Sequence, residues 1–440
     1  IDYVNGRKIK INKTEIGAQD MDYHDSPFFA KKVNITTLDT FVLNLFKLPA
    51  AEFKFAFKNQ QSHFEFPRAM IYSSVVLFDE FHLFGEEGKP LSAGIAAINA
   101  LKEAGVPIVI MSATIDNKLE ELLKKYLGDV KVVEAKDYNV RRNITVDIRE
   151  KEEELFDLVK KKLNEEIIDE KTKERRKKRV LIVFNTRAKA INVYDKLKKE
   201  GLSLLLIHSK FNRIDRTRKV DEIRSGRANL VISTQVIEAG IDTSFDVLIT
   251  EAAPSHNLIQ RAGRVARHGG EGEIYIFPFS KESENIYDKN EVNKTIDKVK
   301  SEKVINEKIL LERNYEVDET LIHDLGAIDN YVFTHTGSVV KLYKEFCSLT
   351  RDVGLILGFP PPNINDPKYA VPLTEDEAIK IIEKEKDNAF VCENDQCEKD
   401  KVNIKSKYCL EIQFISYNIL GVRIPDYNSE TGARLPGDKE

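Results

Sequence analysis

The chain has 440 residues, of which 68 are basic and 72 acidic, so its formal net charge is −4. This balance excludes a histone-like polycation but allows a local basic groove, because net charge averages over the surface. A chain of this length has room for two or three domains, and four cysteines do not make a disulfide scaffold. The sequence shows no apolar run long enough to span a bilayer and no secretory signal, which predicts a cytoplasmic protein without a membrane partner.

A threonine pair stands before the first helix-like stretch. Residues 1–35 are polar and mixed, and Thr36-Thr37-Leu38-Asp39 then leads into an apolar run at 41–46. Threonine and aspartate at this place are good helix caps, which is the interpretation we favour. The alternative is that the two hydroxyls contact a nucleic-acid backbone.

The stretch from Val75 to His82 predicts a strand with functional residues at its end. Its apolar residues run directly into Asp79 and Glu80, as expected of a buried strand in a parallel sheet. The acids would then lie at the carboxyl end of the strand, where open α/β sheets bind ligands. One carboxylate can help to hold Mg²⁺, and the other can orient or deprotonate a water. The alternative is a strand that ends in an acidic turn.

A second strand follows one helix later. Apolar residues between 91 and 101 share one helix face, and Gly105 closes that helix. Pro107–Met111 reads as another buried strand, which ends in Ser112-Ala113-Thr114. Strand, helix and strand make one right-handed βαβ unit, so these hydroxyls should lie beside the acids. Residues 116–127 are typical of an amphipathic helix.

A second α/β set begins after a charged segment. We interpret residues 150–179 as a solvated helix face or connector to a second domain. Strands are predicted at 180–184, 203–207, 230–232, 247–249 and 274–276, and the first three end in hydroxyl, amide or imidazole residues. Two α/β domains with polar edges predict a cleft between them. Residues 281–320 are charged and mostly helical in pattern.

The run from Gln260 to Gly269 carries a second kind of chemistry. On a helix Gln260, Arg264 and Arg267 would share one face. Two guanidiniums there fit the spread charge of a transferring phosphoryl group, and such an arginine finger is worth about 10³–10⁵ in rate. The alternative is a basic surface helix.

Taken together, the motifs resemble those of superfamily 2 helicases. In order they are Thr36–Asp39, Asp79–His82, Ser112–Thr114, Phe184–Thr186, Ser233–Asp242 and Gln260–Arg267. Within that superfamily the chain is most similar to the CRISPR-associated helicase of type I systems. The Asp-Glu-Phe-His form of the acidic box, the run from Thr234 to Arg264, and His208-Ser209-Lys210-Phe211 with Arg216 carry this likeness.

The resemblance implies an α/β fold with tandem RecA-like parallel-sheet domains, the first truncated, and a mainly helical C-terminal accessory domain. Its boundaries would be 1–128, 129–280 and 281–440. The cofactors would be ATP and Mg²⁺. The partners would be a single DNA strand, an RNA-guided CRISPR surveillance complex and an HD nuclease subunit if that is a separate chain.

The resemblance also implies roles for single residues. Asp79 would bind Mg²⁺, Glu80 would activate water, and His82 with Ser112–Thr114 would couple hydrolysis to strand movement. Arg264 and Arg267 would be the fingers. The nucleotide would be faced by Gly240, Asp242 and Gln260, and nucleic acid would be bound by Thr36, Thr37, Ser112, Thr114, Thr186 and Thr234.

One part of the family pattern is missing from these 440 residues. The phosphate-binding loop Gly-x-x-x-x-Gly-Lys-Ser/Thr does not occur, and Gly88-Lys89 is followed by Pro90 and lies after the acidic box. Since the chain begins at Ile1, we expect the carboxyl-terminal part of a longer motor, which hydrolyses ATP poorly on its own. A general superfamily 2 DNA or RNA helicase and a non-catalytic nucleic-acid-binding module stay open as alternatives.

Two further sets of residues are interpreted as incidental. His24-Asp25 and His323-Asp324 are isolated pairs, so no HD nuclease is predicted within the chain. Cys392 and Cys397 with Cys409 are too loosely spaced for a zinc site, and we expect free thiols.

Overall fold

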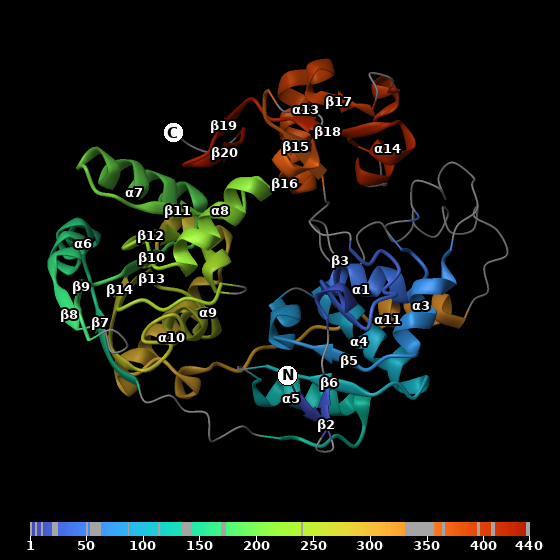
Figure 1. The fold of residues 1–440 in the computed structure, drawn as a ribbon, viewed down its shortest axis with the longest axis horizontal. Coiled ribbons are helices and arrows are strands. Elements are labelled where there is room, and N and C mark those ends of the chain that lie inside the picture. The colour runs from blue at the N-terminus through green and yellow to red at the C-terminus, as the bar shows by residue number, and fades with distance from the viewer. Residues whose placement is uncertain are drawn as a thin grey trace. The chain divides into compact units, whose positions relative to one another are not determined.

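The computed structural model describes residues 2–4, 7–9, 12–19, 25–49, 52, 63–86, 88–112, 115–133, 142–168, 173–238, 241–330, 356–362, 366–393, 397–405 and 410–436. The chain forms two compact units. Unit 1 comprises Ile1–Lys131, Arg313–Lys368 and Leu373–Arg423, and unit 2 comprises Val132–Glu312, Tyr369–Pro372 and Ile424–Glu440. Each is described below by itself (Figure 1).

Unit 2 is built on a parallel sheet of six strands in the order β11-β12-β10-β13-β14-β7. Five of them confirm predicted strands: β10 (Val180–Val183), β11 (Leu205–Ile207), β12 (Leu230–Ser233), β13 (Val247–Glu251) and β14 (Gly270–Phe277). The sixth, β7 (Arg142–Ile148), was not predicted, although its alternating polar and apolar residues are typical of a half-buried strand at the edge of a sheet.

Both faces of this sheet are covered, which explains its continuous apolar strands. On one face Val180 and Ile182 pack with apolar residues of α6 (Leu155–Asn164) and α7 (Arg187–Lys199). On the other, Leu181 and Val183 pack with α8 (Arg213–Arg224), α9 (Ser255–Ala262) and α10 (Lys289–Glu302). These helices flank the sheet in Figure 1.

Unit 1 is dominated by helices around a smaller sheet. The strands β5 (Val76–Phe78) and β6 (Ile108–Ile110) pair in parallel, as predicted, and α4 (Gly88–Glu103) joins them. The core holds apolar residues of α1 (Leu38–Leu45), α3 (Glu65–Tyr72), α4, α5 (Asn117–Leu127) and α11 (Glu319–Asn330). Two further pairs are β3 (Ile16–Gln19) with β4 (Val33–Thr36), parallel, and β1 (Asp2–Val4) with β2 (Arg7–Ile9), antiparallel.

The β5–β6 sheet has one covered face and one bare face. Val76 and Phe78 are buried in the unit 1 core. The alternate residue Leu77 is 58% exposed, its partner Val109 on β6 is 43% exposed, and Met111, directly after β6, is 39% exposed. In the part of unit 1 that the structure describes, this sheet is therefore covered on one side, unlike the sheet of unit 2.

The carboxyl-terminal region contains both helices and strands. A four-stranded sheet has the order β16-β15-β18-β17, formed by β15 (Ile356–Phe359), β16 (Val371–Leu373), β17 (Phe390–Cys392) and β18 (Ile419–Arg423). The helices α13 (Glu375–Glu385) and α14 (Leu410–Ser416) accompany it. A separate hairpin of β19 (Asp426–Asn428) and β20 (Gly432–Arg434) belongs to unit 2.

Two interpretations from the sequence are wrong. Cys392 and Cys397 are not free thiols but form a disulfide, while Cys409 lies outside the described residues. The spacing of five residues is wide for metal ligands but allows the two sulfur atoms to bond. The charged segment 150–179 is not a mere connector: α6 and the hairpin of β8 (Glu166–Ile168) and β9 (Arg175–Lys177) are part of unit 2.

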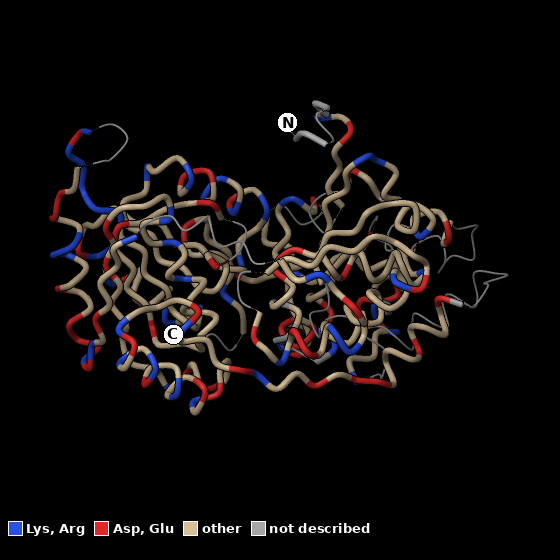
Figure 2. The backbone as a smooth tube through the Cα atoms, turned by 90° about the horizontal axis from the view of Figure 1, so that it is seen from below, with Lys and Arg blue, Asp and Glu red and all other residues tan. Residues whose placement is uncertain are grey.

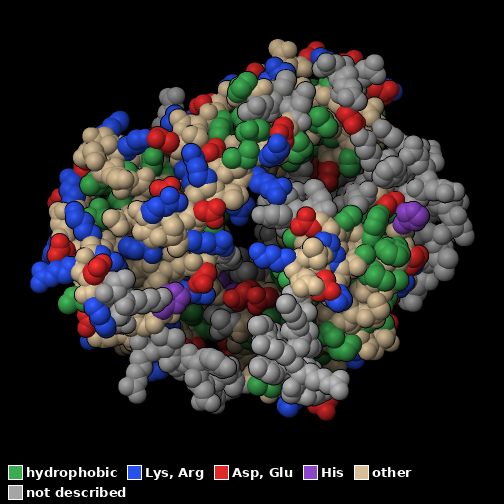
Figure 3. Space-filling view, viewed as in Figure 1, with side chains coloured by type: hydrophobic (Ala, Val, Ile, Leu, Met, Phe, Trp, Pro, Cys, Tyr) green, Lys and Arg blue, Asp and Glu red, His purple; other side chains and the backbone are tan. Residues whose placement is uncertain are grey.

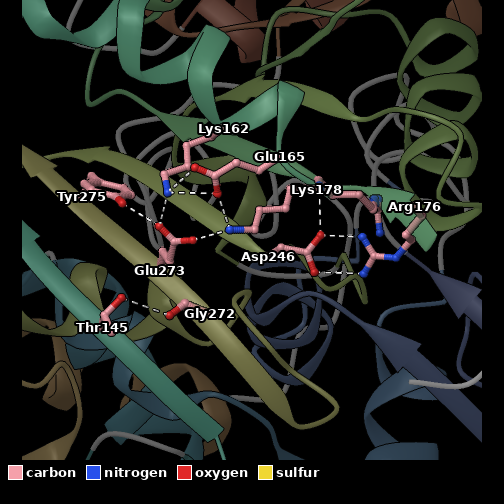
Figure 4. A network of polar contacts seen from close by, with 10 residues as sticks. Thr145, Lys162, Glu165, Arg176, Lys178, Asp246, Gly272, Glu273 and Tyr275 are labelled. Carbon is pink, nitrogen blue, oxygen red and sulfur yellow. Dashed lines mark hydrogen bonds and ion pairs between the residues drawn. The ribbon is translucent and has the colours of Figure 1, made fainter. Parts of the chain in front are cut away.

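That segment is held by ion pairs, shown close up in Figure 4. Glu273 of β14 accepts contacts at 2.5 Å from Lys162, Lys178 and the Tyr275 hydroxyl. Burial raises the pKa of Glu273, but these donors outweigh it and bring the pKa down to about 2. The cluster therefore fixes α6 and the chain after β9 to the amino end of the sheet.

Charge is otherwise distributed evenly over the chain. Lys and Arg alternate with Asp and Glu along the backbone in Figure 2, and the two signs are intermixed on the face shown in Figure 3. This pattern agrees with the near-neutral composition. None of the helices that the structure describes has the length and apolar character needed to cross a membrane.

Candidate nucleotide and nucleic-acid site

The acidic box lies where the sequence predicts, directly after β5. Asp79 is exposed, and its Oδ1 accepts a hydrogen bond of 3.1 Å from the Glu80 backbone N–H. Glu80 has a φ of +50°, which is uncommon for a residue with a side chain. The next residue is fixed again, because Phe81 N–H donates to the Met111 carbonyl at the end of β6. The two strand ends thus share a hydrogen bond on the side where the acids project.

His82 connects the acidic box to the residue that follows β6. It is 4% exposed, and its Nδ1 lies 2.6 Å from Ser112 Oγ and 3.3 Å from Glu80 Oε2. The predicted neighbourhood of the two strand ends is confirmed for Ser112. Ala113 and Thr114 lie outside the described residues.

The threonines before α1 make local hydrogen bonds. Thr37 is the N-cap of α1, and its Oγ1 accepts from Thr40 N–H at 3.4 Å, so the favoured cap interpretation is confirmed for this residue. Thr36 Oγ1 donates to the Gln19 carbonyl at 2.5 Å, which ties β4 to β3. Thr37 remains exposed and Thr36 is half-buried.

In unit 2 the predicted threonines follow β10 and β12 at the same edge of the sheet. Thr186 is the N-cap of α7, and its side chain accepts from Lys189 N–H at 3.3 Å. Thr234, the residue after β12, is only 5% exposed. Of the two, Thr186 is the more accessible to a ligand.

Beneath this edge lies a fully buried arginine that the sequence analysis did not assign. Arg261 of α9 is 0% exposed; its Nε donates to Glu238 at 2.8 Å and its Nη2 to Asn185 Oδ1 at 3.0 Å. Asn257 donates to the same carboxylate at 2.9 Å. Burial lowers the pKa of Arg261, but the Glu238 charge outweighs it, and the net shift is upward. This cluster links α9 to the residues that follow β10 and β12.

A second buried carboxylate supports the same edge. Glu251, at the end of β13, is 1% exposed and accepts hydrogen bonds from Asn185 N–H at 3.0 Å and Ser280 N–H at 2.8 Å. Burial raises its pKa, but Lys189 and these donors lower it more, so the carboxylate stays charged. Asn185 is therefore held from its backbone by Glu251 and from its side chain by Arg261.

The predicted arginine fingers do not lie on a helix, and this expectation is wrong. Helix α9 ends at Ala262, with Gly263 as its C-cap. The chain then pairs with Phe245: Phe245 N–H donates to the Arg264 carbonyl at 2.8 Å, and Ala266 N–H to the Phe245 carbonyl at 2.9 Å. This short β-bridge replaces helical hydrogen bonds, so the two finger residues lie in turns on either side of the bridge residue Val265.

Arg264 and Arg267 differ in their surroundings. Arg264 is 6% exposed, and its guanidinium donates to the backbone carbonyls of Ile237 (2.9 Å) and Glu238. Arg267 is 40% exposed and pairs with Asp242 at 2.8 Å. Both therefore contact the 234–242 segment, in which Gly240 and Asp242 are predicted to face the nucleotide. Gln260 is half-buried on α9, and Gly240 lies outside the described residues.

No metal cluster is found in the part of the chain that the structure describes. No group of three or more His, Cys, Asp or Glu side chains there could hold an ion. His323 and Asp324 are exposed neighbours 3.5 Å apart, and His24 lies outside the described residues. A single exposed carboxylate such as Asp79 still fits Mg²⁺, which keeps several waters and takes its other ligands from substrate phosphates.

The residues that the sequence analysis missed share one property, which is burial of a charge. The three residues Glu238, Glu251 and Arg261 position other residues of the predicted site. Because they are buried, a search for exposed polar residues does not find them. A usable signal was present, since Glu238 and Arg261 each lie among apolar or small residues. Charged residues in such a setting are rarely buried unless they are paired.

Comparison with known proteins identifies part of unit 2. Residues 176–270 match the family model described as "CRISPR-associated nuclease/helicase Cas3, C-terminal". A putative Cas3 of Methanocaldococcus jannaschii is 28% identical over 298 residues, covering 64% of this chain and 38% of that protein. The Cas3 of Methanothermobacter thermautotrophicus is 31% identical over 245 residues, covering 51% and 28%. The chain therefore spans less than half the length of these two relatives.

A solved structure supports the fold. The T. fusca Cas3–AMPPNP crystal structure superposes with a TM-score of 0.53 at 16% identity, covering 76% of this chain and 46% of that one. This likeness confirms the predicted tandem RecA-like α/β fold. The family model and the curated relatives, together with this fold, support a CRISPR-associated superfamily 2 helicase as the kind of protein to which the chain is similar.

Proposed function

We propose that this chain is the motor part of an ATP-dependent DNA helicase of CRISPR interference, which tracks along a single strand and unwinds target DNA. The proposal starts from the helicase relatives of the chain and adds the substrate and the reaction. Domain boundaries at 1–128, 129–280 and 281–440 belong to the same proposal. Its RNA-guided surveillance complex and its HD nuclease are proposed to be partners outside these residues.

The observation that carries the proposal is the link from Glu80 through His82 to Ser112. The group that would activate water is thereby tied to the residue that follows the neighbouring strand. A change in the position of Glu80 during hydrolysis would displace His82 and with it Ser112, in the segment that is proposed to contact DNA. An acidic turn without chemistry has no need of a buried histidine between two strand ends.

Unit 2 would supply the guanidinium groups that stabilise negative charge on the transferring phosphoryl group. Arg264 and Arg267 are proposed as fingers, and both are held against the 234–242 segment, where Asp242 and Gly240 with Gln260 would face the nucleotide. Positioned guanidiniums stabilise the charge of the transferring phosphoryl group. Thr186 at the start of α7 would contact the DNA backbone, as would Thr36, Thr37, Ser112, Thr114 and Thr234.

The bound groups would be ATP and Mg²⁺, with Asp79 as the protein ligand of the ion. When bound, Mg²⁺ would neutralise charge on the β- and γ-phosphates. The chain's own contribution is to hold Asp79 exposed at the strand end and to keep Glu80 beside it in a fixed backbone conformation.

The phosphate-binding loop is expected from polypeptide outside these 440 residues. The bare face of β5–β6 with Leu77, Val109 and Met111 supports this, because parallel sheets are normally covered on both faces. We expect the covering polypeptide to carry the loop.

The test is ATP hydrolysis by the whole product of the reading frame, with and without single-stranded DNA. Glu80→Gln should lower the DNA-stimulated rate by about 10²–10⁴-fold, the usual worth of a general base. Glu103→Gln, an exposed carboxylate at the end of α4, is the matched control and should leave the rate unchanged. Full activity of Glu80→Gln would refute the motor.

A non-catalytic nucleic-acid-binding role is the second candidate, favoured by the missing phosphate loop. It predicts DNA binding without any effect of Glu80→Gln on ATP turnover. A general superfamily 2 helicase would differ from the first proposal by acting without the surveillance complex. DNA cleavage by this chain with a transition metal would contradict the assignment of the nuclease to another polypeptide.

A further inference from the structure

The hairpin β19–β20 is the last described part of the chain, yet it packs on the middle of unit 2. Its strands pair from Asp426 with Arg434 to Asn428 with Gly432. Local chemistry makes the turn: Asn428 Oδ1 accepts from Glu430 N–H at 2.7 Å, and Gly432 has a φ of +77°. The hairpin is thus well specified by its own residues.

Its turn covers His208, the first residue of a motif to which the proposed function gives no role. His208 Nδ1 accepts from Lys210 N–H at 3.1 Å, so the proton is on Nε2, which donates to the Thr431 carbonyl at 2.9 Å. His208 is 0% exposed. Two residues after Thr431, Ala433 N–H donates to the Lys210 carbonyl at 2.9 Å. The hairpin is therefore hydrogen-bonded to the residues that directly follow β11.

The hairpin also takes hydrogen bonds from α7 and α8. Arg187, directly after Thr186, donates from Nη1 to the Ala433 carbonyl at 3.3 Å. Lys219 of α8 donates to the Glu430 carbonyl at 3.1 Å. The Tyr427 hydroxyl donates to Asp215 at 2.6 Å. Two helices and the end of one strand thus meet on this hairpin.

The fit leaves no room for a side chain at Gly432. A Cβ there would lie 2.6 Å from both His208 Cε1 and the Lys210 carbonyl oxygen. Such a fit is expected of a permanent part of the unit and not of a loosely resting tail. In Figure 1 the hairpin lies beside α8 and α7, in agreement with these contacts.

We propose that this hairpin is a clasp that fixes the carboxyl edge of the unit 2 sheet for nucleic-acid binding, with His208 and Arg187 as its positioning residues. The idea rests on the proposed function, since this edge carries Thr186 and Thr234. By joining Ala433 to both Arg187 and Lys210, the clasp sets the spacing of two cationic residues on the ends of β10 and β11. A backbone-tracking motor needs cations at fixed spacing.

The neutral state of His208 reports whether the clasp is closed. Burial lowers the pKa of His208 to about 3, and the nearby Arg187, Lys219 and Lys210 also disfavour its charge, whereas the Thr431 carbonyl favours it. Opening the hairpin would remove most of this burial. The imidazole should then titrate near its ordinary value of 6.5.

The experiment compares Gly432→Ala with Gly226→Ala in the 440-residue chain. Both glycines have positive φ (+77° and +75°), but a Cβ at Gly226 meets nothing within 4 Å, so the control carries the backbone strain without the clash. Histidine NMR titration, with the His208 signal assigned by its loss in His208→Gln, measures whether the hairpin still covers His208. Binding of a fluorescent dT20 strand at several salt concentrations reads its effect.

We expect Gly432→Ala to bring the His208 midpoint from about 3 to near 6.5 and to weaken dT20 binding about tenfold. The salt slope should fall by about 1.4, as for two lost phosphate contacts to a single strand. Gly226→Ala should match the wild type. Tyr427→Phe removes the hydrogen bond to Asp215 and the one accepted from Asn212 N–H, and it should weaken binding about twofold. It serves as the second variant if Gly432→Ala does not fold.

Three results would overturn the inference. Unchanged or tighter dT20 binding with an open hairpin would mean that the hairpin does not position the edge. Weaker dT20 binding by Gly432→Ala with a His208 signal that stays untitrated would mean that binding is lost without any opening of the hairpin. If the wild type itself does not bind dT20, the proposed function fails and the nucleic-acid role of the clasp with it, while the His208 titration still decides whether the hairpin closes the edge.

Discussion

Strands β10 and β5 read alike in the sequence but end in different surroundings. In β10 each of Val180, Leu181, Ile182 and Val183 is 0% exposed, because helices cover both faces of the sheet. In β5 the central Leu77 is 58% exposed, although Val76 and Phe78 beside it are buried. An apolar run therefore predicts a strand, but not whether the same chain supplies both of its covers. Among the described residues, the sheet of unit 2 is covered on both faces, whereas the β5–β6 sheet of unit 1 has one exposed apolar face.

The largest expected effect breaks the buried charge pair of unit 2. Arg261→Met leaves Glu238 buried without its guanidinium, and removal of one partner of such a pair costs about 3–5 kcal/mol. The free energy of unfolding from urea denaturation measures it. Lys289→Met, which removes an exposed pair with Glu284, is the control and should change stability by less than about 0.5 kcal/mol.

A loss below about 1 kcal/mol for Arg261→Met would contradict a central role of the cluster. Arg261→Met combined with Glu238→Leu should recover part of the loss, because the uncompensated charge is then gone. A double variant no better than the single one would mean that packing around Asn185, and not charge, dominates the cluster.

The second prediction compares the two strands directly. Ile182→Ala removes a buried side chain from β10 and should cost about 2–5 kcal/mol. Leu77→Ala removes a mostly exposed one from β5 and should cost less than about 1 kcal/mol in the 440-residue chain. If the bare face is covered by further polypeptide in the whole protein, Leu77→Ala should cost more there. Equal losses for the two variants in the 440-residue chain would remove the contrast between the units.

The smallest effect concerns pH and the cluster around Glu273. Its pKa is lowered from 4.5 to about 2 by Lys162, Lys178 and Tyr275 against the effect of burial. The folded state therefore binds fewer protons than the unfolded one in this range, and the stabilisation is complete above pH 4.5 and lost as the pH falls toward 2.

We expect about 1–2 kcal/mol from this carboxylate after allowance for solvent screening. Urea unfolding of the wild type and of Glu273→Gln, at pH values between 2.5 and 6 in steps of about 0.5, would measure the difference in their free energies of unfolding. The variant should lose the part of the pH dependence that lies below 4.5. Identical pH slopes for the two proteins would show that Glu273 is not held by these donors.

The sequence predicts the continuous apolar strands well, because burial on both faces requires apolar runs such as 180–184. It fails for β7, whose Arg142–Ile148 alternate at the sheet edge, and for the helix that was to carry Arg264 and Arg267. There the bridge to Phe245, a contact distant in sequence, overrides local helical pattern. Buried charges such as Arg261 escape for the same reason, since their partners are chosen by the fold.

The measurement that tests the account most directly is ATP hydrolysis by the 440-residue chain, with and without single-stranded DNA. Asp79, Glu80, Arg264 and Arg267 lie within the chain, and the phosphate-binding loop is proposed to lie outside it. We therefore predict a rate close to that of the buffer, which DNA does not stimulate, together with measurable binding of the strand. Robust DNA-stimulated hydrolysis by these 440 residues would contradict this prediction, because the cleft would then be complete without the loop.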